Sequence, residues 1–138
     1  MCIRDRDGAT ETVADALLEP SVIYAPAVAE VLDATEVHGI AHITGGGLVG
    51  NLPRCFGDHL DAVIDRGSWT EPPIFDEVRR HGDVADDEML RVFNLGVGMC
   101  LVLPAESVST ATELLSASGH QSWTIGEITP GTGTVAVS

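Results

Sequence analysis

The chain has 138 residues, a length that suits one domain with a buried core. Its hydrophobic content of 44% and charged content of 20% are ordinary for a globular protein. The charge is unusual. The chain has 21 acidic residues and only seven basic ones, all arginine, which gives a formal net charge of −14. Binding to nucleic acid or to an anionic membrane requires a basic face, so we expect neither partner.

Three cysteines, Cys2, Cys55 and Cys100, form no C-x-x-C pair. An odd, scattered set fits a reducing compartment better than a disulfide framework. Cys100 lies in an apolar run and is expected to be a buried small hydrophobic residue. No apolar stretch approaches membrane-spanning length, and the N-terminus has no signal-peptide core. We therefore expect a cytoplasmic protein.

The N-terminal half contains proline stops, apolar stripes and short alternating runs. We expect residues 1–16 to form a tail with a possible short helix, which Thr10 or Thr12 caps, and residues 17–138 to form one domain. The patterns predict a helix from Pro26 to Leu32, a strand Ile40–Ile43, a short helix from Leu48 to near Arg54, a strand Leu60–Asp65 and a helix Ile74–Arg80.

The C-terminal half continues with interleaved helices and strands. Asp83, followed by Asp86, predicts a capped start for a helix through Phe93. The run Val97–Leu103 is apolar on both faces, which predicts a central strand. A helix with its stripe at Val108, Ala111, Leu114 and Leu115, and strands at Trp123–Ile128 and Thr134–Val137, complete the prediction. The fold class is therefore α+β, with mixed α/β layers in which helices pack on a mixed β-sheet.

The stretch from His38 to Arg54 carries the most chemical information. An apolar strand breaks at three consecutive glycines and resumes as a helix. Such a turn can cradle phosphate, because glycine lets the backbone approach the anion and the first free N–H groups of the helix point at it. A tight turn without a ligand has the same outline. The flanking side chains favour a site, since each can contact a phosphate or an amide: His42, Thr44, Asn51 and Arg54.

Two of these side chains also have an interpretation that involves no ligand. His42 ends the strand, where it can hold an anion or a carbonyl oxygen or relay a proton, and we take it as the candidate catalytic residue rather than a core histidine. Arg54 can bind phosphate bidentately or can be a solvated surface group. No metal site is expected, because His59 and Asp61 have no second cluster at ligand spacing.

Four segments resemble, in the same order, the C-terminal domain of the aminoimidazole ribonucleotide synthetase family, also called phosphoribosylformylglycinamidine cyclo-ligase. They are Leu17–Tyr24 (LLEPSVIY), His42–Arg54 (HITGGGLVGNLPR), Trp69–Phe75 (WTEPPIF) and Phe93–Met99 (FNLGVGM). The resemblance runs from about residue 17 to about residue 128. It departs at Val22, where the family usually has a basic residue.

The resemblance implies an enzyme that uses ATP and Mg²⁺ to convert formylglycinamidine ribonucleotide to aminoimidazole ribonucleotide in purine biosynthesis. It also implies a homodimer and a cleft between two domains, with most ATP and metal contacts in an N-terminal domain that this chain lacks. We therefore expect the chain to be inactive alone. The substrate contacts that the resemblance implies are Thr44, Gly45, Gly46, Gly47, Asn51, Arg54 and Asn94.

Two alternatives remain open. The first is the C-terminal domain of another ATP-dependent enzyme of the same superfamily, such as formylglycinamidine ribonucleotide synthetase, selenophosphate synthetase, thiamine monophosphate kinase or a hydrogenase maturation factor. Segments Trp69–Phe75 and Phe93–Met99 argue against it. The second is a non-catalytic module that binds a partner or a small anion.

Overall fold

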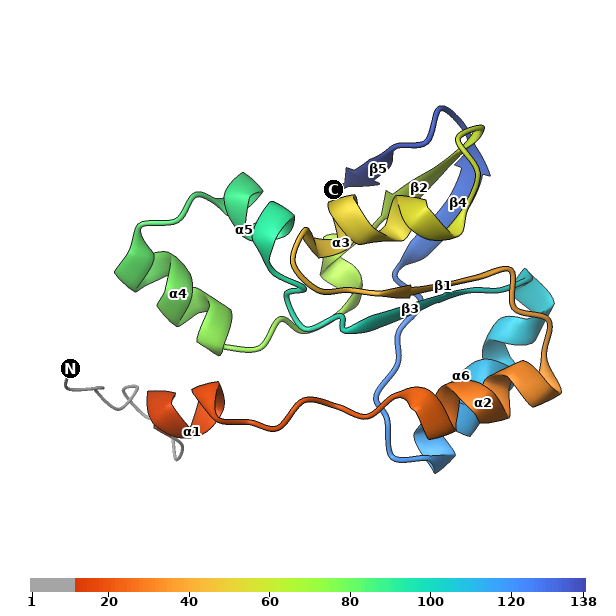
Figure 1. Ribbon diagram of the computed structural model, residues 1–138, viewed down its shortest axis with the longest axis horizontal. Helices are drawn as coiled ribbons and strands as arrows, with labels where there is room; N and C mark the ends of the chain where they lie inside the picture. The colour runs from red at the N-terminus through yellow and green to blue at the C-terminus, as the bar shows by residue number, and fades with distance from the viewer. Residues whose placement is uncertain (1–11) are drawn as a thin grey trace.

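The computed structural model describes residues 12–138, so residues 1–11 of the predicted tail, with the possible cap at Thr10, lie outside the described residues. Helices and short strands alternate along the described part of the chain (Figure 1). The α-helices are α1 (Val13–Leu17), α2 (Ala25–Ala34), α3 (Gly47–Asn51), α4 (Ile74–Gly82), α5 (Asp86–Val92) and α6 (Val108–Ala117). The strands are β1 (Gly39–His42), β2 (Leu60–Ile64), β3 (Met99–Val102), β4 (Gly126–Pro130) and β5 (Val135–Val137), and the short 3₁₀ helices are η1 (Leu52–Cys55), η2 (Arg66–Ser68) and η3 (Ala105–Ser107).

The strands form two sheets. β1 pairs with β3 in antiparallel register, with Ala41 opposite Cys100 and His42 opposite Met99. In the second sheet β2 lies in the centre, antiparallel to β4 and parallel to β5. The predicted α+β class with a mixed sheet is therefore confirmed.

The prediction of a central strand over Val97–Leu103 is wrong. The strand is shorter, and among the described residues β3 pairs only with β1. It is apolar on both faces because Cys100 is buried in the core and all four residues of β3 also line a cavity of about 1670 Å³, which α2, α6 and η1 border. Apolar character on both faces reflects burial of both faces, and it does not determine the number of neighbouring strands.

The main hydrophobic core lies between the inner face of β1–β3, α3 and β2. Trp69 closes it, and its indole N–H donates to the carbonyl oxygen of Leu95 at 3.0 Å. Cys100 is buried, which confirms the prediction of a buried small hydrophobic residue, and burial raises the pKa of its thiol to about 12. The buried members of the cluster are Ala41, Ile43, Leu48, Leu52, Ala62, Ile64, Trp69, Val97 and Cys100.

The helix starts agree with the sequence in part. Thr12 accepts from the Asp15 backbone N–H in a capping box, as one of the two predicted caps. Asp83 does not cap α5: it ends α4 in a left-handed conformation with φ 50°, and the N-cap of α5 is Ala85, which makes no side-chain cap bond. The strand predicted over Trp123–Ile128 corresponds to β4, which begins at Gly126, three residues later than predicted.

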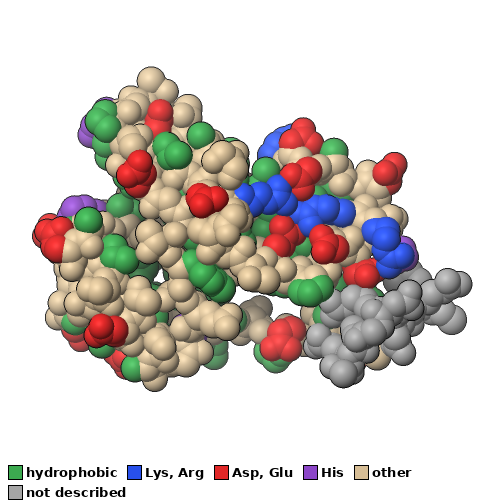
Figure 2. Space-filling view, turned by 180° about the vertical axis from the view of Figure 1, so that it is seen from behind, with side chains coloured by type: hydrophobic (Ala, Val, Ile, Leu, Met, Phe, Trp, Pro, Cys, Tyr) green, Lys and Arg blue, Asp and Glu red, His purple; other side chains and the backbone are tan. Residues whose placement is uncertain are grey.

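A network of ion pairs joins η2, α4 and α5 on the back of the molecule, where blue and red side chains alternate (Figure 2). Glu71 bridges two arginines, because its Oε2 lies 3.1 Å from Arg66 Nη2 and its Oε1 lies 2.6 Å from Arg79 Nη1. Asp86 also accepts from both arginines, and the hydrogen bond from Arg66 is the main cause that holds the pKa of this carboxyl below its usual range. The network ties α4 to α5, the helix against which α3 and the glycine turn pack.

Candidate functional site

The three glycines form the turn that the sequence predicts. Gly46 and Gly47 both have positive φ, at 106° and 59°, a backbone region that favours glycine. A Cβ on Gly47 would overlap the carbonyl oxygen of Leu90 and lie 2.9 Å from that of Phe93. The turn therefore packs backbone to backbone against the C-terminal end of α5. Gly45 has open space around it.

Asn51 holds the turn from inside. Its side chain is 3% exposed, and its amide Nδ2 donates to the carbonyl oxygens of Gly47 at 2.8 Å, Gly45 at 3.3 Å and Thr44 at 3.4 Å. The buried amide is thus occupied by the loop's own carbonyl groups. Asn51 shapes the site, and its predicted contact with substrate stays a prediction.

The geometry leaves two donors exposed at the turn. Within residues 12–138, the backbone N–H groups of Gly45 and Gly46 donate no hydrogen bond, whereas that of Gly47 donates to Thr44 at 3.1 Å. Free N–H groups on consecutive residues in a concave turn attract anions. The exposed Thr44 hydroxyl flanks them. The turn therefore presents two free backbone donors, and its role in binding an anion stays a prediction.

Arg54 ends the helical segment that starts at the turn. Among the five arginines of the described residues, it alone has no ion pair, since Arg66, Arg79, Arg80 and Arg91 all contact carboxylates. It is exposed and borders the cavity. Gly46 and Arg54 lie at opposite ends of α3 and η1, about 12 Å apart along a helical rise. They are therefore suited to different groups of one ligand.

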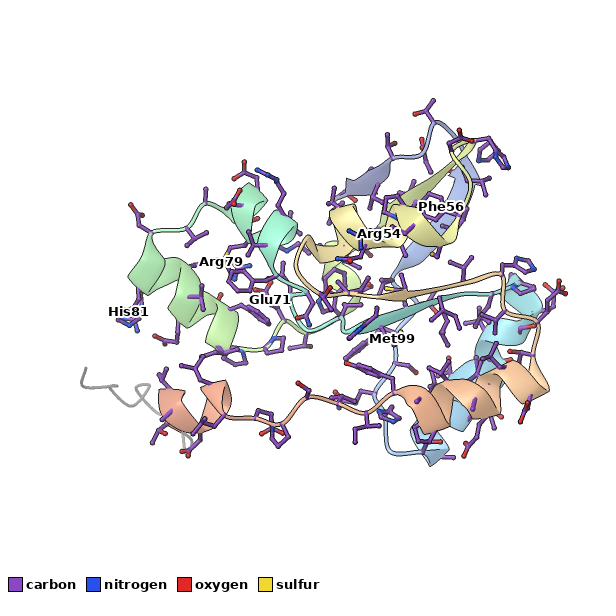
Figure 3. The ribbon with its side chains drawn as sticks, in the orientation of Figure 1. Arg54, Phe56, Glu71, Arg79, His81 and Met99 are labelled. Atoms are coloured by element: carbon purple, nitrogen blue, oxygen red, sulfur yellow. The ribbon has the colours of Figure 1, made fainter. Side chains whose placement is uncertain are left out.

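His42 lies on the other face of the β1–β3 sheet. Successive strand residues point to opposite faces, and its neighbours Ala41 and Ile43 are buried in the core with α3. Figure 3 shows Arg54 on the α3 side of β1, whereas Met99, which pairs with His42 and shares its face, points toward α2. The structure thus separates His42 from Arg54, although the two residues flank the same turn in the sequence.

Asn94 has a structural role as well. Its Oδ1 accepts from the backbone N–H of Gly96 at 3.1 Å, in a turn where Leu95 and Gly96 both have positive φ. The turn leads the chain from α5 into β3. A contact between Asn94 and substrate stays a prediction.

Sequence reasoning missed two aromatic rings, that of Tyr24 beside His42 and that of His120 beside Tyr24. The ring of Tyr24 lies with its centroid 6.1 Å from that of His42, edge to face, and 6.1 Å from that of His120. Tyr24 rests on Gly98, where any Cβ would overlap its hydroxyl group. Desolvation raises the pKa of Tyr24. The sequence signal for this contact is Gly98 itself, which lies within the segment Phe93–Met99 (FNLGVGM).

The described residues contain no group of three or more His, Cys, Asp or Glu side chains placed to hold a metal ion. Within the same residues, no helix combines the length and the apolar character needed to cross a membrane.

Comparison with known proteins identifies the fold. Residues 3–138 match the family described as AIR synthase related protein, C-terminal domain. The chain is 44% identical over 120 residues to a phosphoribosylformylglycinamidine cyclo-ligase of Synechococcus, covering 86% of this chain and 35% of the relative. It is 45% identical over 127 residues to the enzyme of that name from Myxococcus xanthus, covering 92% and 37%, and 45% identical over 124 residues to that of Paraburkholderia phymatum, covering 90% and 35%.

The chain therefore spans little more than a third of the length of the curated relatives that it matches. The boundary predicted at residue 17 stays a prediction. The family match covers nearly every residue and includes the glycine turn and the Asn94 turn. The chain belongs to the AIR synthase related protein family, as its C-terminal domain.

Proposed function

We propose that the chain is the C-terminal part of a cyclo-ligase that converts formylglycinamidine ribonucleotide to aminoimidazole ribonucleotide in purine biosynthesis. The observation that carries the proposal is the identity of 44–45% to three relatives that bear the cyclo-ligase name. The same names favour this activity over the other enzymes of the superfamily.

In this proposal the glycine turn binds the phosphate group of the substrate. The free N–H groups of Gly45 and Gly46, with the Thr44 hydroxyl, supply donors at the exposed side of the turn. Gly47 and Asn51 contribute through the loop that they shape. A preorganised backbone cradle of this kind costs no rearrangement when the anion arrives.

Arg54 and His42 contact other parts of the substrate. Arg54 is the unpaired cation at the far end of the α3–η1 segment and stabilises negative charge there. His42 stays the candidate for holding a carbonyl oxygen or relaying a proton at the reacting atoms, on the face of β1 toward Tyr24. This chain then works by positioning and by charge stabilisation.

ATP, Mg²⁺ and a homodimer belong to the proposal for the whole enzyme. The described residues do not fit a metal site, since they bring no cluster of carboxylates together and the chain has no lysine to hold a nucleotide phosphate. We therefore assign the metal and most nucleotide contacts to the remaining part of the enzyme, and we derive no step through them.

Isothermal titration calorimetry tests the half-site in the isolated chain. We expect formylglycinamidine ribonucleotide to bind more tightly than inorganic phosphate, because only the nucleotide reaches both the turn and Arg54. Gly46→Val, which forces a branched residue to φ 106°, should abolish binding of both ligands. Arg54→Ala should weaken the nucleotide about tenfold or more and leave phosphate unchanged. Equal binding by wild type and both variants would refute the assignment.

A further inference from the structure

Three rings meet beneath the β1–β3 sheet, where α2 and α6 pack together (Figure 1). The ring of Tyr24 contacts the rings of both His42 and His120, with each centroid distance at 6.1 Å. The planes of Tyr24 and His42 meet at 65°, an edge-to-face arrangement that aromatic rings prefer over a flat stack. Tyr24 directly precedes α2, His42 ends β1, and His120 follows α6, so the fold brings together rings that are distant in the sequence.

The backbone of Gly98 supports the Tyr24 ring. A Cβ on Gly98 would overlap the hydroxyl oxygen of Tyr24 and lie 2.9 Å from its Cζ. Gly98 does not have a positive φ, so its backbone conformation does not require glycine, whereas the space that Tyr24 occupies does. The carbonyl oxygen of Gly98 also accepts from the N–H of Ile43 at 2.9 Å, and Ile43 directly follows His42. The phenol therefore rests on the same pair of strand ends that carries the imidazole.

The helices fix the Tyr24 ring from the other side. The backbone N–H of His120 donates to the carbonyl oxygen of Leu115 at 2.9 Å, which holds His120 at the end of α6. The carbonyl oxygen of Tyr24 accepts from the N–H of Val28 at 3.0 Å in the first turn of α2, and α2 packs against α6. Desolvation raises the pKa of Tyr24, so the phenol stays neutral at the pH of an ordinary assay and contributes its ring.

His42 has no hydrogen bond that could orient it. Within residues 12–138 its imidazole makes no hydrogen bond and no ion pair, whereas the imidazoles of His38, His59 and His81 each lie beside a carboxylate. The residue is exposed at the end of its strand. An exposed side chain of this kind exchanges among rotamers unless a neighbour restricts it. The contact with Tyr24 supplies that restriction, and it leaves both imidazole nitrogens open to a ligand.

We propose that Tyr24 is the positioning residue of His42, and that its ring, held between Gly98 and His120, fixes the imidazole in the orientation that the reaction requires. The inference rests on the proposed function for the role of His42, whereas the contact itself does not depend on that role. Orientation matters because a proton relay needs the imidazole nitrogen within hydrogen-bond reach of the reacting group. A misplacement of about 1 Å costs on the order of a hundredfold in rate. Tyr24 thus acts on turnover through His42.

Nuclear magnetic resonance of the isolated chain tests the contact. The ring current of an aromatic neighbour shifts the signals of histidine ring protons, so the signals of His42 report the position of Tyr24. We expect Tyr24→Leu, which removes the ring, to shift the His42 signals. Tyr24→Phe, which keeps the ring, should leave them near their wild-type positions. The indole N–H signal of Trp69, which is buried and bonded to the Leu95 carbonyl oxygen, shows that each variant is folded.

A change at Gly98 perturbs the same contact from the other side. The Cβ of Gly98→Ala would overlap the Tyr24 hydroxyl oxygen, so the phenol must move and the His42 signals should shift. Combining Gly98→Ala with Tyr24→Phe removes the overlapping oxygen and should return the signals toward their wild-type positions. Phe56→Leu, which removes another ring that lines the cavity, is the matched control and should leave them unchanged.

Two spectroscopic results would overturn the proposal. Unchanged His42 signals in Tyr24→Leu would show that the two rings do not touch. A double variant as shifted as Gly98→Ala alone would show that the displaced hydroxyl group is not the cause.

Turnover of the Myxococcus xanthus enzyme with its 127 matched residues replaced by this chain tests the consequence. We expect Tyr24→Leu to lower kcat about tenfold or more and to change KM less than about twofold, because the proposed phosphate contacts belong to the glycine turn and Arg54. Tyr24→Phe should retain the kcat of the unaltered chimera. If His42→Ala lowers kcat and Tyr24→Leu does not, the positioning role is refuted and the proposed function stands. A folded chimera without turnover, with the spectroscopic rescue intact, would count against the proposed function and support the fixed orientation of His42.

Discussion

Replacement of Gly47 by alanine tests the packing of the glycine turn. Gly47 stands at φ 59°, and an added Cβ would overlap the Leu90 carbonyl oxygen and lie 2.9 Å from that of Phe93. Both neighbours are backbone atoms at the end of α5, so neither can move aside as a flexible side chain would. The turn or α5 must shift.

The magnitude follows from two contributions. A non-glycine residue in the left-handed region costs about 1–2 kcal/mol, and overpacking against a fixed neighbour costs about 1–3 kcal/mol. We expect Gly47→Ala to lower the free energy of unfolding by about 2–5 kcal/mol, a large part of the roughly 5–15 kcal/mol typical of a domain.

Urea unfolding followed by tryptophan fluorescence measures this loss, because Trp69 lies in the core next to α3. With a urea dependence of about 1–3 kcal/mol per molar, the midpoint should fall by about 1 M or more. Gly50→Ala is the matched control on the same helix, since its Cβ would meet nothing within 4 Å. It should stabilise the chain by about 0.5–1 kcal/mol, because alanine is the better helix former.

Two results would refute the reasoning. If Gly47→Ala unfolds at the wild-type urea concentration, α3 does not approach α5 through a bare backbone. If Gly50→Ala is as destabilised as Gly47→Ala, the loss comes from the helix itself and the contact with Leu90 has no part in it.

Two further predictions concern charged groups. Glu71→Gln removes the carboxylate that bridges Arg66 and Arg79 and is 21% exposed, so it should cost about 1–3 kcal/mol in the same urea assay. Glu88→Gln, whose partner is a surface arginine, should cost less than about 0.5 kcal/mol; equal losses would contradict the ranking. The hydrogen bonds that Asp61 accepts from the backbone N–H groups of residues 134 and 132 lower the pKa of its carboxyl. Its contribution is then present above the unfolded pKa near 3.8 and lost as pH falls through the lower folded value, so the stability difference between wild type and Asp61→Asn should shrink below pH 4; a constant difference would exclude this linkage.

Local patterns predicted most of the fold. Proline at the start of α2 and α4, the three glycines at the start of α3, and the alternation at β2 each fix a local backbone choice, and the structure has an element at every one of these places. Each of these signals depends only on residues that are neighbours in the chain, so it can be recognised from the sequence alone.

Contacts distant in sequence could not be predicted. Tyr24 reaches His42, and His120 reaches Tyr24, because α2 and α6 pack together beneath the β1–β3 sheet (Figure 1). Asn51 was expected to face a ligand, but the depth of the turn buries its amide against the loop carbonyl groups. The face on which His42 lies likewise depends on which side of a two-stranded sheet forms the core.

The central claim is that this chain serves as the C-terminal part of a cyclo-ligase. The most direct test is steady-state turnover of formylglycinamidine ribonucleotide, with ATP and Mg²⁺, by the Myxococcus xanthus enzyme in which this chain replaces the matched 127 residues. The account predicts formation of aminoimidazole ribonucleotide, with kcat/KM lowered at least tenfold by Arg54→Ala. A folded chimera that forms no product, under conditions in which the parent enzyme is active, would contradict it.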